Sequence, residues 1–333
     1  MVFTDMNKKR IWITWEKHRR SFELAKALNA EIYVWPKFEE FNRIIRYFCL
    51  SAKTLSVIAK ERPDIIFVQN PSIILTALVA IFRNIFSYKL LTDRHSNFKF
   101  ETLGNKSMKW KFFHFLSRYT VRNADMTIVT NDYLRDIVDK WGGRGFVLQD
   151  KLPELKLGKS IPLDGEKNIV FISTFSDDEP IAEIIDAAKR LNKNWRLYIT
   201  GKYHGYRKKH LLRNLPANIR LTGFLSEEDY QSLLMSSDVL IILTTKDHLL
   251  NCGAYEAVVL LKPAVLSDTE TIKNYFDKGM VFSKCDSHSI ASAITEAVEN
   301  NEKLKQDIGV LKEELVKNWG QRFENLIRTI REF

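Results

Sequence analysis

The chain has 333 residues, enough for two domains of ordinary size. Hydrophobic residues make up 45% and charged residues 28%, which excludes a disordered chain and favours a packed globular protein. The net charge is +10, and the excess lies in residues 1–160, where 28 Lys and Arg stand against 16 Asp and Glu. A basic half suggests an anionic partner: a membrane surface, a nucleic acid or a phosphorylated ligand.

Cysteines and apolar runs narrow the class further. Cys49, Cys252 and Cys285 lie far apart without a CxxC spacing, which argues against a zinc site or a disulfide framework and fits a reducing compartment. The N-terminus has no long apolar segment, so we expect no secretion signal. The most apolar run, 73–85, contains Arg83 and is shorter than the roughly 18 residues that a membrane-spanning helix needs.

Short apolar strands alternate with amphipathic helical segments through the first half. This alternation of β-branched or aromatic runs with helical periods is typical of βαβ units and a parallel sheet. The predicted strands are 10–15, 31–35, 64–69, 88–93, 125–130 and 144–149. Segment 151–167 then breaks the pattern with two prolines and two glycines, which predicts a linker.

The alternation restarts after this linker. The predicted strands are 168–173, 195–200, 218–223, 238–243, 263–267 and 279–283, and residues 286–332 are mostly helical. We therefore predict an α/β protein with two doubly wound, Rossmann-like domains. The expected boundaries are 1–155 for the first domain, 156–315 for the second, and 316–333 for a C-terminal helix that crosses back to the first. Ligands of such sheets bind beyond the carboxyl ends of the strands.

Four short motifs in the second half suggest a family. They are Gly223-Phe224-Leu225-Ser226, Ser237-Asp238-Val239, Glu256-Ala257 and Pro263-Ala264-Val265. Their succession resembles the donor-nucleotide half of GT-B glycosyltransferases, and more narrowly the large retaining group (group 1, family 4-like) with the E-x7-E motif. At motif level the similarity spans about half the chain, and the first half matches in architecture only. The resemblance implies two domains facing a central cleft, the first binding the acceptor and the second the nucleotide-sugar donor.

Two departures from the family pattern mark a divergent branch. The first acid of the E-x7-E pair would fall at position 248, which is His248, with Asp247 beside it. The Arg and Lys that usually follow the first strand of the second domain are also absent, because residues 173–180 read STFSDDEP. The family's diphosphate clamp is therefore not carried over at that place.

Glu256 is the leading candidate for a donor contact. The resemblance implies that it accepts hydrogen bonds from the ribose hydroxyls, a task that suits a carboxylate because it can accept from two donors at once. The alternative is an acid that merely stabilises a helix start. Gly253 permits close approach of the backbone, and free N–H groups at a helix start attract phosphate, so we expect the diphosphate here, with Leu250 and Asn251 near the sugar. An ordinary loop is the alternative.

Other candidate donor contacts lie at the carboxyl ends of the second-domain strands. Lys202 could replace the missing clamp as a point charge on phosphate. The hydroxyls of Ser173 and Thr174 could bond phosphate oxygens, and residues 223–225 would lie against the base. The predicted donor-binding residues are Glu256, Gly253, Asn251, Leu250, Lys202, Gly201, Ser173, Thr174, Gly223, Phe224, Leu225 and Tyr255.

The candidate catalytic residues lie in the first half. The resemblance implies that His95, after a predicted strand, hydrogen-bonds the transferred sugar, and a structural histidine is the alternative. Glu16 and His18 follow the first strand and would serve as general base only if the enzyme inverts. The predicted acceptor-binding cations are Arg19, Arg20 and Arg94, although Arg19 and Arg20 also fit a solvated helix face.

Residues 106–122 interleave aromatic with basic side chains. At helical spacing the aromatics are core residues by default, but the combination also suits a helix on an anionic membrane. The predicted membrane contacts are Lys106, Lys109, Trp110, Lys111 and Arg118. We therefore expect a cytoplasmic protein that is peripheral at the inner face of the cell membrane.

Together these patterns and the resemblance predict a sugar transferase of the hexosyltransferase class, and the resemblance to the retaining group implies retention. It would take a UDP- or GDP-sugar and pass the sugar to a lipid-linked or cell-surface glycan acceptor, in polysaccharide or glycolipid biosynthesis. We expect no metal and no cofactor beyond the donor, because GT-B enzymes generally stabilise the leaving diphosphate with helix dipoles and cationic side chains. The alternatives are a nucleotide-sugar 2-epimerase on the same fold and a catalytically degenerate partner subunit. Nucleic-acid binding rests on charge alone and is not expected.

Overall fold

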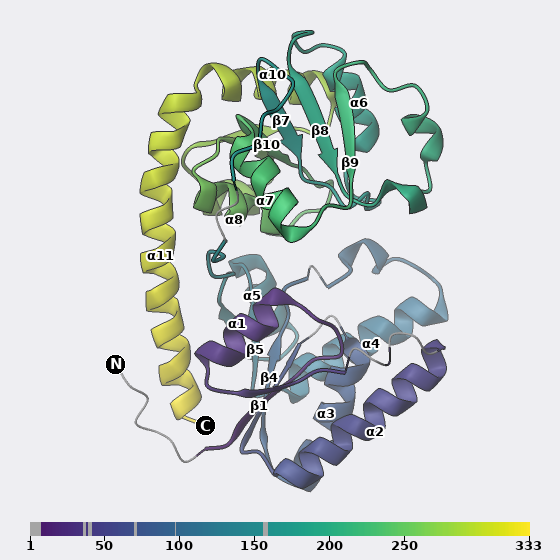
Figure 1. The fold of residues 1–333 in the computed structure, drawn as a ribbon. Helices are drawn as coiled ribbons and strands as arrows, with labels where there is room; N and C mark the ends of the chain where they lie inside the picture. The colour runs from purple at the N-terminus through teal and green to yellow at the C-terminus, as the bar shows by residue number, and fades with distance from the viewer. Residues whose placement is uncertain (1–7, 36–37, 39–41, 70–71, 97, 156–158) are drawn as a thin grey trace. The chain divides into compact units, whose positions relative to one another are not determined.

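The computed structural model describes residues 8–35, 38, 42–69, 72–96, 98–155 and 159–333 (Figure 1). Residues 1–7 and residues 156–158 of the predicted linker lie outside the described residues. The chain divides into two compact units, Met1–Lys151 with Trp319–Phe333, and Leu152–Asn318. Each unit holds one six-stranded sheet, and one strand lies within each of the twelve predicted segments. The predicted α/β class with two doubly wound sheets is confirmed.

The first unit contains a parallel sheet in the order β2-β1-β3-β4-β5-β6. Its strands are β1 (Arg10–Ile13), β2 (Glu31–Tyr33), β3 (Ile65–Gln69), β4 (Lys89–Asp93), β5 (Met126–Val129) and β6 (Gly145–Val147). The helices between them are α1 (Arg19–Ala27), α2 (Arg43–Glu61), α3 (Ile73–Phe86), α4 (Met108–Asn123) and α5 (Asp132–Lys140), with a short 3₁₀ turn η2 (Phe100–Thr102) before α4.

Both faces of this sheet are buried under helices. One face packs against α2 and α3, and the other against α1 and the end of the C-terminal helix. Successive residues of β1 point to opposite faces: Ile11 and Ile13 pack under α2 and α3, and Trp12 packs under α1 and the C-terminal helix. Trp12 stacks on Phe67 with ring centroids 5.5 Å apart. Strands buried on both faces must be apolar throughout, which explains why continuous apolar runs identified them in the sequence.

The second unit contains a parallel sheet in the order β12-β11-β10-β7-β8-β9. Its strands are β7 (Asn168–Phe171), β8 (Arg196–Thr200), β9 (Ile219–Gly223), β10 (Val239–Ile242), β11 (Ala264–Ser267) and β12 (Met280–Ser283). The strand order reverses between β7 and β10, which is where such sheets bind ligands. The helices are α6 (Ile181–Ala188), α7 (Glu227–Ser236), α8 (Cys252–Leu260), α9 (Glu270–Tyr275) and α10 (Ser287–Glu299), with 3₁₀ turns η3 (Tyr203–Gly205) and η4 (Lys209–Leu212).

The second sheet is also buried on both faces. Helices α6 and α10 cover one face, and α7, α8 and the start of α11 cover the other. Along β10, Ile241 faces α6 and α10, and Leu240 and Ile242 face α7, α8 and α11. The apolar residues that surround Glu256 in the sequence are therefore core residues of α8 and β11.

Helix α11 (Asn301–Arg331) is continuous, with no break near the expected boundary at 315 (Figure 1). Its part from Trp319 onward belongs to the first unit. There Leu326 and Ile330 are buried in the core, and the Trp319 indole N–H donates to the carbonyl oxygen of Gln149 at 3.1 Å. None of the helices described combines the length and the apolar character required to cross a bilayer.

Gly279, before β12, offers a test of packing against α11. Its φ is +69°, and a Cβ there would lie 2.3 Å from Ile308 Cγ1 and 2.6 Å from the Ile308 amide nitrogen. We expect Gly279→Ala to lower the free energy of unfolding by about 2 kcal/mol or more, because backbone strain adds to the steric clash. Urea denaturation followed by circular dichroism measures this change.

The matched control is Gly309→Ala, one residue beyond Ile308 on the same helix. A Cβ at Gly309 meets nothing within 4 Å, so alanine should be neutral or stabilise by up to about 1 kcal/mol through its helix propensity. Equal effects of the two substitutions would contradict the packing described here.

Candidate functional site

A pocket of about 390 Å³ lies at the carboxyl ends of β7, β8 and β9. Open parallel sheets bind ligands at this edge, and the volume is typical of small-molecule sites. Seven of the twelve predicted donor-binding residues line it: Ser173, Thr174, Gly201, Lys202, Gly223, Phe224 and Leu225. The other lining residues are Ile172, Thr200, Glu227 and Tyr230. The parallel order of the three strands thus brings together residues from three separate loops.

Two glycines with positive φ lie at the strand ends that line the pocket. Gly201 has a φ of +106°, and a Cβ there would lie 2.3 Å from the carbonyl oxygen of Ser173. Gly223 has a φ of +73°. Both conformations are rare for residues with side chains, so glycine is required at the wall of the pocket.

The Phe224 side chain is 84% exposed at this pocket. An exposed aromatic face can stack on a planar ring of a ligand. The partly buried Leu225 and Ile172 extend the apolar lining. This part of the pocket is therefore lined by one exposed aromatic ring and two aliphatic side chains.

Glu179 fills a cradle of hydrogen-bond donors in the loop after β7. Its carboxylate accepts from the Ser173 hydroxyl (2.6 Å), from the Thr174 amide (3.0 Å) and hydroxyl (2.9 Å), and from the Ser176 amide (3.3 Å). Convergent donors of this kind bind anions. The hydroxyls of Ser173 and Thr174, predicted to bond phosphate, are therefore occupied by an internal carboxylate. Sequence reasoning missed Glu179, although the spacing Ser176-x-x-Glu179 is a known pattern for contacts before a helix.

Glu256 lies on α8, partly buried, one hydrogen bond behind the pocket wall. The Tyr230 hydroxyl donates to Glu256 Oε2 at 2.7 Å, and Tyr230 lines the pocket. Burial, together with the Glu256 charge, raises the pKa of Tyr230, so the phenol remains a donor at neutral pH. Glu256 is outside the first turn of α8, beyond the reach of a simple helix-start effect. Tyr230 is a site residue that the sequence pattern did not reveal.

The remaining predicted donor residues surround the start of α8. Leu250 is partly buried against the α8 core, and the buried Oδ1 of Asn251 has no hydrogen-bond partner among the described residues. Tyr255 is fully buried with its ring against Phe276, so it is a core residue and its predicted donor contact is wrong. Gly253 is needed for a different reason than expected, because a Cβ there would lie 2.9 Å from Ile242 Cγ1. It permits close helix–strand packing.

Acidic residues occupy the loop after β7, where this sequence lacks the Arg and Lys of the family's diphosphate clamp. Asp178 accepts hydrogen bonds from the Thr244 hydroxyl (2.7 Å) and the Lys246 ammonium (3.0 Å). Burial alone would raise the pKa of Asp178, but these bonds and one from Ser176 lower it to about 2. Lys246 is thus a cation at the β7–β10 reversal that sequence reasoning missed. It lies two residues before His248, which has a φ of +59°.

Among the described residues, no group of three or more His, Cys, Asp or Glu side chains is arranged to hold a metal ion. The expectation that the reaction needs no metal remains a prediction.

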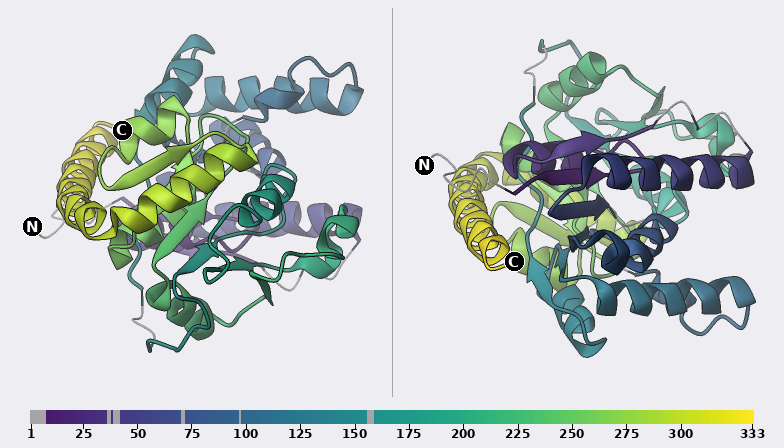
Figure 2. Two further views of the ribbon diagram at one scale, coloured as in Figure 1. Left: turned by 90° about the horizontal axis from the view of Figure 1, so that it is seen from above. Right: turned by 90° about the horizontal axis from the view of Figure 1, so that it is seen from below.

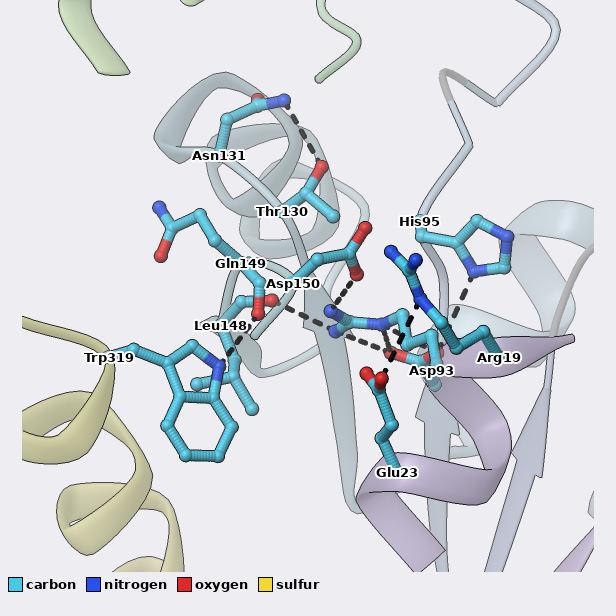
Figure 3. Close-up of polar contacts among 11 residues, drawn as sticks. Arg19, Glu23, Asp93, His95, Thr130, Asn131, Leu148, Gln149, Asp150 and Trp319 are labelled. Atoms are coloured by element: carbon cyan, nitrogen blue, oxygen red, sulfur yellow. Dashed lines mark hydrogen bonds and ion pairs between the residues drawn. The ribbon is translucent and has the colours of Figure 1, made fainter. Parts of the chain in front are cut away.

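Two histidines stack at the carboxyl edge of the first sheet. The rings of His18, just before α1, and His95, just after β4, have centroids 4.5 Å apart. Burial, followed by the neighbouring His95, lowers the pKa of His18. His95 Nδ1 lies 3.6 Å from Asp93 Oδ2 (Figure 3). The structure therefore brings together two of the three predicted catalytic residues. The third, Glu16, is exposed and precedes His18 by two residues.

An arginine between two carboxylates lies beneath this pair. Arg20 is 3% exposed and donates to Asp93 from Nε (3.0 Å) and Nη2 (2.8 Å) and to Asp150 from Nη1 (2.6 Å). Its Nη2 also donates to the carbonyl oxygen of Leu148 at 2.9 Å. Although burial opposes ionisation, the Arg20 charge and hydrogen bonds hold the pKa of Asp93 well below its usual range. The predicted acceptor contact of Arg20 is wrong, because its donors are used inside the first unit.

The other two predicted acceptor cations differ from each other. Arg19 is exposed and lies 3.6 Å from Glu23 on the next turn of α1 (Figure 3). Arg94 is 1% exposed, and its guanidinium lies 3.6 Å above the Phe98 ring. Burial lowers the pKa of Arg94 to about 9. Arg94 is closed to solvent in this structure, so the predicted acceptor contact does not fit it.

The predicted membrane contacts lie on and before α4. Lys106, Lys109, Lys111 and Arg118 are exposed, as expected. Trp110 is partly buried, with the Lys109 ammonium 4.8 Å from its ring.

Arg20 and Arg19 form a matched pair for mutagenesis. We expect Arg20→Gln to lower the free energy of unfolding by about 3 to 5 kcal/mol, because it leaves the buried Asp93 without its counter-charge. Arg19→Gln removes an exposed pair and should change it by less than about 0.5 kcal/mol. Thermal and urea denaturation of the purified variants measure both. A stable Arg20→Gln protein would show that Asp93 is neutralised in another way.

Two family models match the chain: "Glycosyl transferases group 1" over residues 156–309 and "Glycosyltransferase Family 4" over residues 15–145. No curated protein matches this chain in sequence. Solved structures with a similar fold include sucrose-phosphate synthase from Thermosynechococcus elongatus, with 13% identity and a TM-score of 0.75 over 97% of this chain and 100% of that one.

Other similar structures are Anabaena HepE in complex with UDP and glucose, and TarM. HepE has 15% identity and a TM-score of 0.72 over 95% of this chain and 91% of its own. TarM has 16% identity and a TM-score of 0.64 over 84% of this chain and 58% of its own. At these identities the likeness is one of fold. Because the two family models together match residues 15–145 and 156–309, the chain belongs to the GT-B glycosyltransferases of group 1, family 4-like.

Proposed function

We propose that this glycosyltransferase is a hexosyltransferase that takes its sugar from a nucleotide-sugar donor, with retention. The observation that carries the proposal is the pocket at the ends of β7, β8 and β9, with the Tyr230–Glu256 hydrogen bond in its wall. Anabaena HepE, which shares the fold, has been solved with UDP and with UDP-glucose. We therefore expect a UDP- or GDP-sugar.

The pocket suggests how such a donor lies. The base would stack on the exposed ring of Phe224, beside the backbone of Gly223. The ribose hydroxyls would donate to Glu256, whose carboxylate already accepts from Tyr230. The diphosphate would meet Lys202 and the start of α8, where free N–H groups favour anions. No metal and no further cofactor is proposed, because cations and backbone dipoles can stabilise the leaving group.

For the acceptor we propose a lipid-linked or growing cell-surface glycan, in polysaccharide or glycolipid biosynthesis. The basic excess of the first half supports an acidic or phosphorylated acceptor. His95 is the proposed contact to the transferred sugar, because it lies at the carboxyl edge with Asp93 to orient it. With retention, Glu16 and His18 need not act as a general base. The exposed Arg19 is the remaining acceptor cation of the three.

The epimerase alternative requires acids and histidines that converge on a sugar. His18, His95 and Asp93 do converge, but Asp93 is already paired with Arg20. Analysis of products without an acceptor separates the two reactions, since an epimerase converts its substrate alone.

The first experiment is calorimetric titration of the protein with UDP, GDP, CMP and dTDP. We expect one of them to bind, and Glu256→Ala to weaken it about tenfold or more, equivalent to about 1.4 kcal/mol, because the ribose hydroxyls lose their acceptor. Tyr230→Phe should have a smaller effect, because the carboxylate remains.

A control for the titration is Glu183→Ala, which removes an acid from the first turn of α6. It should leave nucleotide binding unchanged. If no nucleotide binds, the proposed donor site fails and the catalytically degenerate partner subunit becomes the better explanation.

Glu179 provides a second test of the donor site. Its carboxylate occupies the donors after β7 and places negative charge at the pocket. We expect Glu179→Gln to tighten nucleoside diphosphate binding about threefold to fivefold, because Coulomb repulsion of about 0.6 to 1 kcal/mol is removed. The same titration measures it, with the nucleoside monophosphate as control, where the gain should be smaller. Weaker binding would mean that the carboxylate itself accepts a ligand hydroxyl.

A further inference from the structure

Exposed apolar side chains gather on one helical layer of the first unit. Of the 17 large hydrophobic side chains that are exposed in the described part of the chain, ten lie on α2, α3, α4 or the segment before α4. They are Ile44, Ile45, Phe48, Ile74, Ile81, Ile85, Leu103, Met108, Phe112 and Phe115. Helices that already cover a sheet ordinarily present a polar outer face, so an apolar one indicates a partner.

The same three helices are almost free of acids. They contain nine Lys or Arg residues and one acid, Glu61, which is bonded to Lys9 at 2.6 Å. Helices α3 and α4 have no Asp or Glu at all. The layer therefore combines apolar side chains with uncompensated positive charge.

Helix α3 packs against both α2 and α4 (Figure 2). Its outer side exposes Ile74, Ile81 and Ile85, while its one cation, Arg83, is paired with Asp125 at 2.7 Å. The other eight Lys and Arg residues lie on the flanking helices α2 and α4. An apolar centre flanked by cations matches the hydrocarbon boundary and anionic headgroups of a bilayer.

Helix α4 also carries a pocket of about 570 Å³. Lys111, Arg118 and Arg122 line it from one stripe of the helix, since they are spaced by seven and four residues. No carboxylate is among the described residues that line it, which also include Leu103, Asn105, His114, Phe115, Tyr119 and Asn123. An acid-free pocket with three cations is suited to a phosphate.

One buried cation, Arg94, lies close to His114 in the wall of this pocket, and burial lowers the pKa of His114, so its imidazole is neutral at pH 7. His114 is 8% exposed and its Nδ1 has no hydrogen-bond partner in the described residues. Among the residues that the structure describes, Nε and Nη1 of Arg94, which is 1% exposed, have no hydrogen-bond partner. Arg94 and Arg118 both lower the pKa of His114 further. The exposed carboxylate of Glu101 acts in the opposite direction and raises the pKa of His114. An uncompensated buried charge raises the local potential and attracts an anion.

We infer that the α2–α3–α4 face docks on an anionic membrane surface and that the α4 pocket receives the phosphate of a lipid headgroup. Leu103 and Phe115 line the pocket, and Met108 and Phe112 continue the exposed side of α4. When the phosphate of a lipid lies in the pocket, the acyl chains of that lipid would thus lie beside apolar side chains. The inference deepens the proposed function and rests on it only for the lipid-linked acceptor, because lipid binding requires no sugar transfer.

The test is sedimentation of the full chain with phosphatidylcholine vesicles, with and without phosphatidylglycerol. We expect binding to the anionic vesicles only. The double variant Lys111→Ser and Arg118→Ser should weaken it about 25-fold, from about fivefold for each cation removed at an anionic surface. Phe112→Ser with Phe115→Ser, both exposed, should also weaken it without loss of folding.

The matched control is Val316→Ser with Lys317→Ser, an exposed apolar and an exposed basic residue of α11 in the second unit. These should leave vesicle binding unchanged. Failure of the unaltered protein to bind anionic vesicles, or unchanged binding by both α4 variants, would overturn the inference. Self-association lost in the Phe112 and Phe115 variant, without vesicle binding, would show instead that a second copy covers the face.

Calorimetric titration of the same variants with the preferred nucleotide keeps the two proposals apart. Intact nucleotide binding with lost vesicle binding assigns the defect to the membrane face. Vesicle binding without any nucleotide binding would leave the membrane face standing and remove the proposed donor site.

Discussion

Parallel hydrogen bonding of all six strands in each sheet is the constraint on which the rest depends. Because each strand must start again from the same edge, every connection crosses a face of the sheet as a helix or loop, and both faces become buried. The carboxyl ends then gather at one edge. This is why loops distant in sequence, after β7, β8 and β9, line one pocket, and why His18 and His95 stack although many residues separate them.

At these edges the structure neutralises charge internally before any ligand arrives. In the first unit, Arg20 is paired with two carboxylates. In the second unit, Glu179 accepts hydrogen bonds from the donors after β7, and Asp178 is paired with Lys246. A divergent branch of the family thus has acids where a diphosphate clamp would be expected. A donor would have to meet a site with Lys202, backbone N–H groups and few free cations, so nucleotide affinity depends on how these internal bonds rearrange.

The structure shows where the excess positive charge of the first half lies. Part of the basic excess lies on α2 and α4, beside the exposed isoleucines of α3, rather than at the carboxyl edge. The edge cations Arg20 and Arg94 are buried and cannot serve a solvent-borne acceptor as the structure stands. The positive charge of the first half is therefore divided between internal pairs and an outer helical face.

The sequence alone determined the twelve strands, the α/β class and the family, because strands buried on both faces must be apolar throughout and because the motifs around Gly223 and Glu256 are local. It also located most of the residues that line the pocket at the ends of β7, β8 and β9, since strand ends can be read from such runs. Only the tertiary structure decided which polar side chains are free: Arg20, Ser173 and Thr174 are occupied, Tyr255 is core, and Tyr230, Glu179 and Lys246 join the site. The roles of Arg20, Tyr230 and Lys246 depend on partners far away in the chain, and spacing along one sequence carries no information about them. Glu179 differs, because it bonds residues three to six positions before it.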